Sequence, residues 1–567
     1  MRADLFRPTL DFLYGPQQGE VTARLVAEKL DRFHAERQLR AIRPFDHTDS
    51  ILITYGDQFR QENCPPLSTL EDFCDEFLQG LVPGVHILPF FPYSSDDGFS
   101  VIDYRQVDPN LGNWAEVERI ASRYRLMVDA VLNHCSREHA WFKGFLRGDP
   151  AYQDYFITVD PAQDLSQVVR PRALPLLTAF QTSRGEQHVW TTFSADQVDL
   201  NYANPSVLLE IVDILLGYLA HGAQTIRLDA IAYLWKELGT SCIHLPQTHR
   251  AVQFFRLLLD AAAPGAVMIT ETNVPHQDNV AYFGDGTNEA QLVYNFALPP
   301  LTLHALQTGN GRVLTQWASQ LELPSAQTTF FNFLASHDGI GLNPARGLLT
   351  EEEIEAMVER ACQSGGLVSY KTNSDGSQSP YELNANYLDA LSDPSREDGL
   401  LLGERRFIVA QAIMLGLRGV PGIYVHSLIG SRSWREGVAL TGHNRTINRQ
   451  KFTRDEIWPQ LGDPSSPRGR IYSQYARLLQ ARSSSPAFDP FGMQKIFDLH
   501  PGALVIRRDV PGSRVWCCYN LGEAEIELEL PEDGQNWRDL LGTNPDSQYS
   551  PSDITLKPYQ VLWLAKE

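Results

Sequence analysis

The sequence is poor in features that stabilise secreted or membrane proteins. Its 567 residues contain seven cysteines, an odd number without metal-binding spacing, so we expect reduced thiols, as in the cytosol. The adjacent Cys517 and Cys518 fall in one predicted strand, so their side chains should diverge. No apolar run reaches the length of a membrane span, and the N-terminal MRADLFRPTLDFLYG lacks the apolar core of a signal peptide. We therefore expect a soluble, cytoplasmic protein.

Basic residues are also scarce. Lys and Arg number 48 against 69 Asp and Glu, and the net charge is −21. This balance argues against nucleic acid or an anionic membrane as a partner, and an anionic ligand would need a local basic patch. No Gly-rich phosphate loop appears, so we expect no organic cofactor. The chain is nonetheless long enough for a large core and more than one domain.

What the sequence does contain is an alternation of short apolar strands with helical stretches. The predicted strands are Ser50–Tyr55, Val85–Phe91, Met127–Leu132, Thr225–Tyr233, Ala266–Thr270, Leu292–Phe296, Thr328–Leu334 and Pro421–Val425. The clearest helices are Trp114–Tyr124, Pro205–His221, Gln247–Ala262, Leu349–Ala361 and Phe407–Leu417. Strands and helices that alternate in this way predict an α/β fold with a parallel sheet, here a (β/α)8 TIM barrel.

Irregular stretches and a change of composition divide this pattern into domains. The predicted barrel comprises residues 1–134, 199–338 and 396–487, and its first 48 residues are predicted as a helical extension, most clearly over Val21–Gln38. Residues 135–198 and 339–395 are predicted as two inserted subdomains. Short alternating strands in residues 488–567 predict a C-terminal antiparallel β domain.

One strand, TIRLDAIAY, places Arg227 and Asp229 on the face opposite Ile226 and Leu228. A fixed cation beside a carboxylate keeps it ionised and nucleophilic, although a buried structural ion pair is the alternative. Polar residues also follow other predicted strands: Ser94–Phe99, Asn133-His134, Glu271 and His337-Asp338. A lone His or Glu at a strand end is usually unremarkable. Their shared level in one barrel predicts a catalytic site at the carboxyl ends of the strands.

These segments resemble a known family. VDAVLNH, TIRLDAIAY, ITET and ASHD are similar, in order, to the four signature segments of the α-amylase superfamily, and the resemblance covers nearly the whole chain. It implies that Asp229 is the nucleophile, Glu271 the general acid/base, and Asp338 the carboxylate that binds sugar hydroxyls. It further implies a glucose subsite to which these residues contribute: Phe99, His134, Arg227, Tyr233 and His337. The superfamily calcium is not expected, since no ligand cluster appears beyond Asn133.

Further segments narrow the resemblance. SSDDGFS resembles the sucrose-active branch, in which Asp96 and Arg449 would close the glucose pocket, while a solvated turn is the alternative for Asp96. Lys236–His249, Tyr294–Leu306 and Ser336–Gly341 resemble the sucrose phosphorylase group. In that group the glycines after the catalytic Asp belong to a loop thought to rearrange.

The resemblance implies phosphorolysis of an α-glucoside by double displacement, with the two reacting carboxyl groups about 5–5.5 Å apart. The substrates would be a small α-glucoside and inorganic phosphate. Arg172 is the first candidate for phosphate binding and Arg346 the second, because an arginine binds phosphate through its planar fork. Either can instead be an ordinary surface arginine.

The identity of the acceptor also comes from resemblance. DAIAYLWKELGTSCIHLPQTH with ITETNVPH is similar to glucosylglycerate phosphorylases, which implies release of D-glycerate and formation of α-D-glucose 1-phosphate. The alternatives are phosphorolysis of sucrose, sucrose 6′-phosphate or glucosylglycerol, simple hydrolysis by an α-glucosidase, and a silent barrel scaffold. The retained carboxylates disfavour the scaffold. We expect a monomer or a homodimer.

Overall fold

The computed structural model describes residues 2–37, 39–172, 174–373, 377–532, 537–542 and 548–566. Eight parallel strands close into a barrel, and each hydrogen-bonds to the next barrel strand along the chain. They are β1 (Ile51–Thr54), β3 (Gly84–Ile87), β4 (Arg125–Ala130), β9 (Ala223–Leu228), β10 (Val267–Thr270), β11 (Leu292–Tyr294), β12 (Thr329–Asn332) and β16 (Val420–Tyr424). Every predicted strand overlaps one of these, which confirms the predicted barrel.

Helices cover the outside of the barrel. They include α2 (Pro66–Phe73), α3 (Trp114–Arg123), α5 (Pro205–Ala220), α6 (Pro246–Ala262), α7 (His276–Val280), α8 (Leu298–Thr308), α9 (Arg312–Ser319), α12 (Gly399–Gly416) and α16 (Pro467–Ser483). Local sequence sets their starts. At α5, the Asn204 side chain accepts a hydrogen bond from the Ser206 N–H at 3.0 Å, and Pro205 needs no partner in the first turn.

Two insertions stand at the carboxyl ends of β4 and β12. In the first, β5 (His134–Ser136) pairs antiparallel with β8 (Gln197–Asp199), and α4 (Ala140–Arg147), β6 (Leu177–Thr182) and β7 (Gly185–Trp190) lie between them. The second contains β13 (Ile340–Gly341), α10 (Glu351–Gln363), β14 (Leu367–Thr372), β15 (Gln378–Asn384) and α11 (Tyr387–Ala390). The domain limits given above stay predictions.

After β16 the chain returns to the rim of the barrel before α16. This stretch holds α13 (Val425–Leu428), α14 (Arg435–Thr441), the 3-10 helix η7 (Asn444–Asn448), β17 (Phe452–Thr453) and α15 (Arg454–Gly462). The segment HNRTINR, with Arg445 and Arg449, lies over η7 and the residue after it. Those two arginines therefore reach the barrel from a loop above its last strand.

The N-terminal extension is shorter than predicted. Helix α1 (Arg2–Glu36) bends at Gly15, whose φ is 76°, and packs against the barrel helices α5 and α6. The described residues 39–48 are not helical, and Gln38, the predicted helix end, lies outside the described residues. Pro44 disfavours a helical conformation of the residue before it, and Arg43 pairs with the buried Asp49 at 2.7 Å. The apolar spacing of the region did not reveal either effect.

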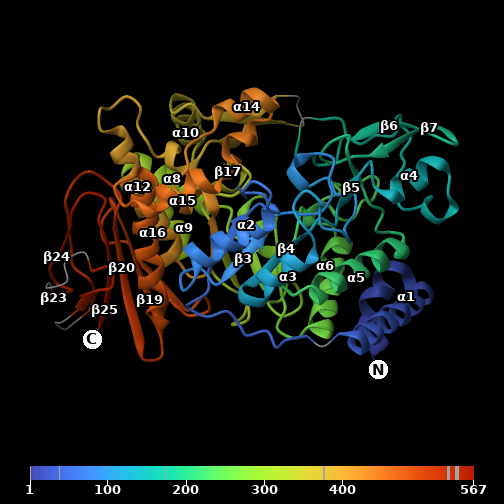
Figure 1. The fold of residues 1–567 in the computed structure, drawn as a ribbon, viewed down its shortest axis with the longest axis horizontal. Helices are drawn as coiled ribbons and strands as arrows, with labels where there is room; N and C mark the ends of the chain where they lie inside the picture. The colour runs from blue at the N-terminus through green and yellow to red at the C-terminus, as the bar shows by residue number, and fades with distance from the viewer. Residues whose placement is uncertain are drawn as a thin grey trace.

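The C-terminal region forms the predicted antiparallel sheet. Its strands are β18 (Met493–Phe497), β19 (Ala503–Val510), β20 (Ser513–Asn520), β25 (Val561–Lys566), β22 (Trp537–Asp539) and β23 (Gln548–Tyr549), and β21 (Ile526–Leu528) pairs separately with β24 (Ile554–Leu556). On β20, Cys517 faces the main core of the protein and Cys518 faces a second core within this domain. Figure 1 shows this sheet and α1 at opposite ends of the molecule.

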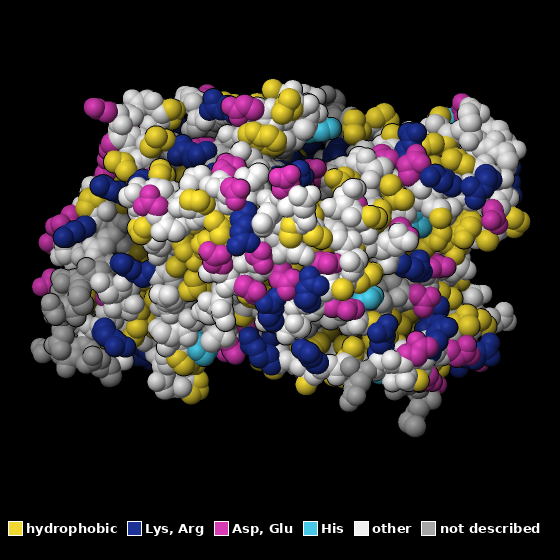
Figure 2. All heavy atoms as spheres, viewed as in Figure 1, with side chains coloured by type: hydrophobic (Ala, Val, Ile, Leu, Met, Phe, Trp, Pro, Cys, Tyr) yellow, Lys and Arg dark blue, Asp and Glu magenta, His cyan; other side chains and the backbone are white. Residues whose placement is uncertain are grey.

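Among the described residues, no helix combines the length and apolar character that a membrane span requires. Figure 2 shows acidic and basic side chains intermingled over the displayed face.

Candidate active site

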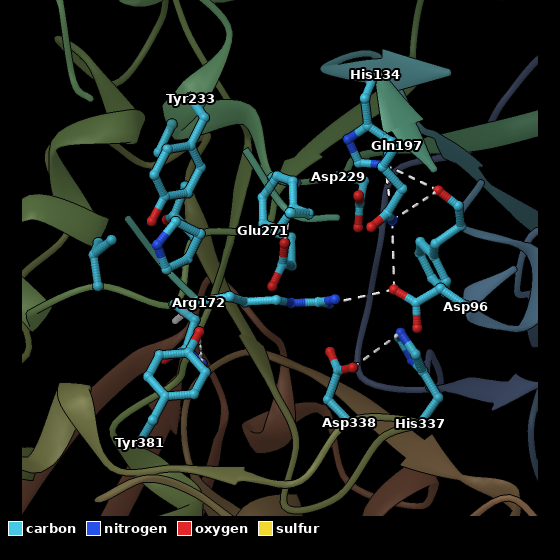
Figure 3. Close-up of a pocket in the computed structure, with 18 of the residues that line it drawn as sticks. Asp96, His134, Arg172, Gln197, Asp229, Tyr233, Glu271, His337, Asp338 and Tyr381 are labelled. Carbon is cyan, nitrogen blue, oxygen red and sulfur yellow. Dashed lines mark hydrogen bonds and ion pairs between the residues drawn. The ribbon is translucent and has the colours of Figure 1, made fainter. Parts of the chain in front are cut away.

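The ends of three barrel strands bring three carboxyl groups into one pocket. Asp229 follows β9 directly, Glu271 follows β10 directly, and Asp338 lies in the loop after β12. All three line the same pocket, whose labelled residues are drawn in Figure 3. The sequence therefore predicted correctly that these strand ends converge, although it left the roles of the acids as expectations.

The barrel backbone holds the first two acids in register. The Asp229 N–H donates to the Ala130 carbonyl at 3.1 Å, and the Glu271 N–H donates to the Leu228 carbonyl at 3.2 Å. Ala230 then takes a left-handed conformation with φ 49°, which is strained for a residue with a side chain. This turn points the Ala230 N–H at the Glu271 carboxylate, 3.1 Å away.

A buried arginine lies beneath the acids. The Arg227 guanidinium is 2.8 Å from Asp229 and 3.7 Å from Glu271, and it also hydrogen-bonds to Asp129. Asp129 in turn lies 2.6 Å from His86. Both Asp129 and His86 are fully buried, so a continuous polar chain crosses the barrel from β3 to Asp229 and Glu271.

Sequence reasoning missed Asp129 and His86. A signal was present, because Asp129 interrupts the apolar strand MVDAVL and pairs in register with Arg227 on the neighbouring strand. Burial works against ionisation of Asp129, but Arg227 and His86 outweigh it and lower its pKa to about 2. Asp129 is therefore an ionised counter-charge for Arg227.

The pKa values of Asp229 and Glu271 are both raised. Burial, opposed by Arg227 and reinforced by Glu271, raises the pKa of Asp229 to about 8. Burial, opposed by Arg227 and reinforced by Asp338, also raises the pKa of Glu271. Interacting acids lose their protons as a pair, so one proton remains on the pair at neutral pH. Arg227 lies closer to Asp229 than to Glu271, so it opposes protonation of Asp229 more strongly.

Asp338 lies among arginines. Arg445 is 2.5 Å from it, Arg449 is 3.7 Å away, and His337 is 3.6 Å away. Burial works against its ionisation, but Arg445 outweighs burial and holds the pKa of Asp338 below its usual range. Arg445 is in turn fixed by the buried Glu382, which accepts two hydrogen bonds from its guanidinium at 3.1 and 2.9 Å.

The glycines after Asp338 have a steric reason. A side chain on Gly339 would lie 2.5 Å from the Leu383 carbonyl and 2.6 Å from the Glu382 carboxylate, and one on Gly341 would lie 2.9 Å from the Asn273 amide. The Gly339 N–H also hydrogen-bonds to Glu382. The prediction that these glycines serve a moving loop stays a prediction, but close packing alone requires them.

One side of the pocket is formed around Asp96. Its carboxylate lies 3.3 Å from Arg172, 3.4 Å from the Gln197 amide and 3.8 Å from Arg449. Burial opposes its ionisation, yet Arg172 and Arg449 outweigh burial and hold the pKa of Asp96 below its usual range. Arg449 itself bonds more closely to Asp97, at 2.6 Å. The described lining of the pocket does not include Arg449, whereas Arg172 reaches Asp96 across the pocket (Figure 3).

The two predicted histidines lie on the same side. The ring of His337 stacks on Phe99 with centroids 4.7 Å apart, and burial lowers its pKa to about 3 despite Asp338. His134 Nε2 lies 2.9 Å from the Phe99 carbonyl, and burial, opposed by Asp199, lowers its pKa as well. Both rings are therefore neutral at pH 7.

Aromatic residues line the other side of the pocket. Tyr233 and Tyr381 lie away from Asp96 (Figure 3). Phe193 from the first insertion packs edge-on against Tyr233, with centroids 5.5 Å apart, and Arg172 lies over the Phe193 ring. The Asn273 amide donates to the Tyr381 hydroxyl at 3.3 Å. Sequence reasoning missed Phe193, Tyr381 and Asn273, of which the first two lie on insertions without regular periodicity.

Comparisons with known proteins agree with this geometry. Residues 76–340 match the family model described as the catalytic domain of alpha amylase. The chain is 49% identical to a glucosylglycerate phosphorylase of Spirochaeta thermophila, covering 99% of this chain and 98% of the relative. It is 51% identical to a glucosylglycerate phosphorylase of Allomeiothermus silvanus (98% and 97% covered), and 31% identical to a sucrose phosphorylase of Agrobacterium vitis (80% and 91% covered).

The chain belongs to the α-amylase family, in its sucrose phosphorylase group. It is therefore an enzyme. Among solved structures, the sucrose 6F-phosphate phosphorylase from Thermoanaerobacter thermosaccharolyticum superposes with a TM-score of 0.73 at 25% identity, covering 84% of this chain and 94% of that chain.

Within this family fold, the structure separates the two arginines predicted for anion binding. Arg172 lines the pocket, whereas the described lining does not include Arg346. The Arg346 guanidinium instead pairs with Glu351 at 2.6 Å and donates to the Pro380 carbonyl at 3.1 Å. Arg445, which the sequence did not single out, lines the pocket in its place. Its signal was its position in HNRTINR, four residues before Arg449.

Proposed function

We propose that this enzyme is a retaining glucosylglycerate phosphorylase, which converts 2-O-α-glucosylglycerate and phosphate into α-D-glucose 1-phosphate and D-glycerate. The observation that carries the proposal is the identity of 49% and 51%, over nearly the whole chain, to two proteins of that name. The sucrose phosphorylase relative, at 31%, supports the same reaction with a different acceptor less strongly.

In the proposed first step, ionised Asp229 attacks the anomeric carbon while protonated Glu271 gives its proton to the glycosidic oxygen. The carbon–oxygen bond breaks, glycerate leaves with that proton on its hydroxyl, and a glucosyl ester forms on Asp229. This step needs the charge on Asp229 and the proton on Glu271, and the closer contact of Arg227 with Asp229 supports that arrangement. Asp338 and Asp96 would bind the sugar hydroxyls, and His134 and His337 would hydrogen-bond the same ring.

In the second step, phosphate attacks the anomeric carbon from the side that glycerate left, and Glu271 takes a proton from the phosphate. The ester bond between the anomeric carbon and Asp229 breaks, which frees Asp229 as a carboxylate. Two inversions give net retention, which requires the carboxyl groups to be about 5–5.5 Å apart. Phosphate and glycerate are both anions, and both would need cations in a chain of net charge −21. Arg172 and Arg445 are the arginines in the described pocket lining and suit this need.

Arg172 would have two states in this cycle. In the structure it bonds to Asp96, the acid proposed to hold the sugar. A bound glucosyl group would compete for that carboxylate and release the guanidinium towards the side of Tyr233 and Tyr381. The release would supply a positive charge to the acceptor side only when the donor sugar is in place.

The test compares donors at a fixed phosphate concentration. Initial rates of glucose 1-phosphate formation are measured with glucosylglycerate, sucrose, sucrose 6′-phosphate and glucosylglycerol, with D229N as the blank. We expect glucosylglycerate to give the highest kcat/KM. A higher kcat/KM with sucrose or glucosylglycerol would show that the enzyme is a phosphorylase of that glucoside instead. Free glucose as the main product in phosphate buffer would identify an α-glucosidase.

A further inference from the structure

A buried lysine lies just behind the pocket and takes no part in the reaction described above. Lys236 follows the 3-10 helix η4 (Ile231–Tyr233), and its side chain is 2% exposed. Its ammonium group lies 2.6 Å from Asp199 Oδ2 and 2.7 Å from Asn133 Oδ1. The described lining of the pocket includes none of these three residues. These three residues therefore do not contact the substrate directly in the proposed reaction.

The ammonium group fixes the orientation of the Asn133 amide. An ammonium can only donate hydrogen bonds, so the atom of Asn133 that faces it must be the carbonyl oxygen. The NH2 group of the amide then points the other way. It lies 3.0 Å from Asp199 Oδ2 and 3.3 Å from His134 Nδ1.

The oriented amide determines which ring nitrogen of His134 carries the proton. An amide NH2 can only donate, so Nδ1 of the neutral ring must be the accepting nitrogen and Nε2 must carry the hydrogen. At the other end of the ring, Nε2 lies 2.9 Å from the Phe99 carbonyl oxygen, which can only accept. The Gln197 amide nitrogen also lies 3.2 Å from Nε2, but its two hydrogens have acceptors in the Phe99 carbonyl at 3.2 Å and Asp96 Oδ2 at 3.4 Å. Hydrogen bonds at both nitrogens therefore select one tautomer.

The carboxylate that pairs with the Lys236 ammonium group is itself fixed by hydrogen bonds. Asp199 is fully buried and also accepts hydrogen bonds from the N–H and the hydroxyl of Thr192, both at 2.7 Å. Asp199 belongs to β8 of the first insertion, Asn133 follows β4 of the barrel, and Lys236 follows β9. The lysine thus joins three segments that are distant in sequence, next to the histidine that faces the pocket.

We propose that Lys236 is a positioning residue for His134. Through Asn133 it keeps the hydrogen on His134 Nε2, where the Phe99 carbonyl accepts it and a bound sugar hydroxyl would share it. The tautomer of His134 can be tested independently of the reaction. The part that concerns turnover rests on the proposed function, in which His134 hydrogen-bonds the sugar.

The first test reads the tautomer directly. In 15N-labelled enzyme, protonated and bare imidazole nitrogens give separate NMR signals, and the His134 signals are identified by their loss in His134→Gln. We expect a bare Nδ1 in the wild type and in Lys236→Arg, which keeps the donors. We expect a mixture or the opposite tautomer in Lys236→Met. An unchanged tautomer in Lys236→Met would overturn the proposal.

Lys236→Met leaves the buried Asp199 carboxylate unpaired and can fail to fold for that reason alone. The double variant K236M/D199N removes the ammonium group without leaving an unpaired charge, and the same spectrum is then recorded on it. An unchanged tautomer in the double variant counts equally against the proposal.

The second test separates positioning from stability. Thr192→Val is the matched control, because it removes a hydrogen bond from the same Asp199 but leaves the contacts from Lys236 to Asn133 and from Asn133 to His134. We expect kcat/KM for every cleaved glucoside to fall roughly 10–100-fold in Lys236→Met, as when a group that orients another is removed, and to change less than about twofold in Thr192→Val. An equal loss in both variants would reduce Lys236 to a structural role. A different acceptor in the donor panel would refute the proposed function and leave the NMR result untouched.

Discussion

Replacing Asp129 by Asn tests the polar chain beneath the reacting acids. The change keeps the shape of the side chain but removes the charge that balances Arg227. A pKa of about 2, against an ordinary value of 3.8, means that the folded protein favours the ionised carboxylate by about 2 kcal/mol. Asp129 is fully buried, so solvent does not screen this contribution. We therefore expect D129N to lose roughly 2–3 kcal/mol of unfolding free energy at pH 7.

The pH dependence of this loss has a definite sign. The pKa of Asp129 is lower in the folded state, so its contribution is present above the unfolded pKa and disappears as the pH falls through the folded one. The difference in unfolding free energy between wild type and D129N should therefore shrink as the pH falls from about 4 towards 2. Guanidinium chloride titrations at several pH values measure it. A difference that stays constant across this range would refute the assignment.

The same variant should change the chemistry. With Asp129 neutral, the positive charge of Arg227 acts more strongly on Asp229 and Glu271 and lowers the pKa at which the pair loses its last proton. The basic limb of the kcat/KM profile reports that loss in the free enzyme, so it should move to lower pH in D129N. Glu118→Gln, which removes an exposed carboxylate on α3, should leave the limb in place. A basic limb that stays or moves to higher pH in D129N would refute the reasoning.

Three further changes test other parts of the site. Asp229→Asn should lower kcat by roughly 10⁴–10⁶ while circular dichroism stays native, and substantial residual turnover would exclude Asp229 as the nucleophile. Arg172→Ala should raise KM for phosphate more than it slows hydrolysis of the glucosyl intermediate, measured as glucose release without phosphate; an unchanged phosphate dependence would remove Arg172 from phosphate binding. Gly339→Ala places a methyl group 2.5 Å from the Leu383 carbonyl and should lower the free energy of unfolding by about 1–3 kcal/mol, measured by thermal unfolding. Gly462→Ala, where nothing lies within 4 Å of the new methyl group, should change it little. Equal losses in the two variants would contradict the close packing.

The barrel and its acids could be predicted from sequence because both depend on local patterns. Each barrel strand is a short apolar run, and each of the three acids follows such a run within a few residues. Parallel strands in one barrel end at one rim, so a linear pattern was enough to bring Asp229, Glu271 and Asp338 together.

The rest of the site depends on contacts that no local pattern records. Arg445 is fixed by Glu382, 63 positions earlier, and Gln197 reaches Asp96 from 101 positions away. Both contacts form only when an insertion folds back over the carboxyl-end rim of the barrel. Arg346 was the second candidate for phosphate binding in the sequence, and its pairing with Glu351 becomes evident only from the folded insertion.

Strand β20 carries a consequence for engineering. Val515, Cys517 and Tyr519 belong to the main core, while Trp516 and Cys518 belong to the core of the C-terminal domain. A single strand thus supplies side chains to both units, and cutting the chain ahead of it would expose apolar surface on the barrel side. Chimeras that exchange this domain between relatives must therefore carry matching partners from α12, or the junction will lose its shared apolar packing.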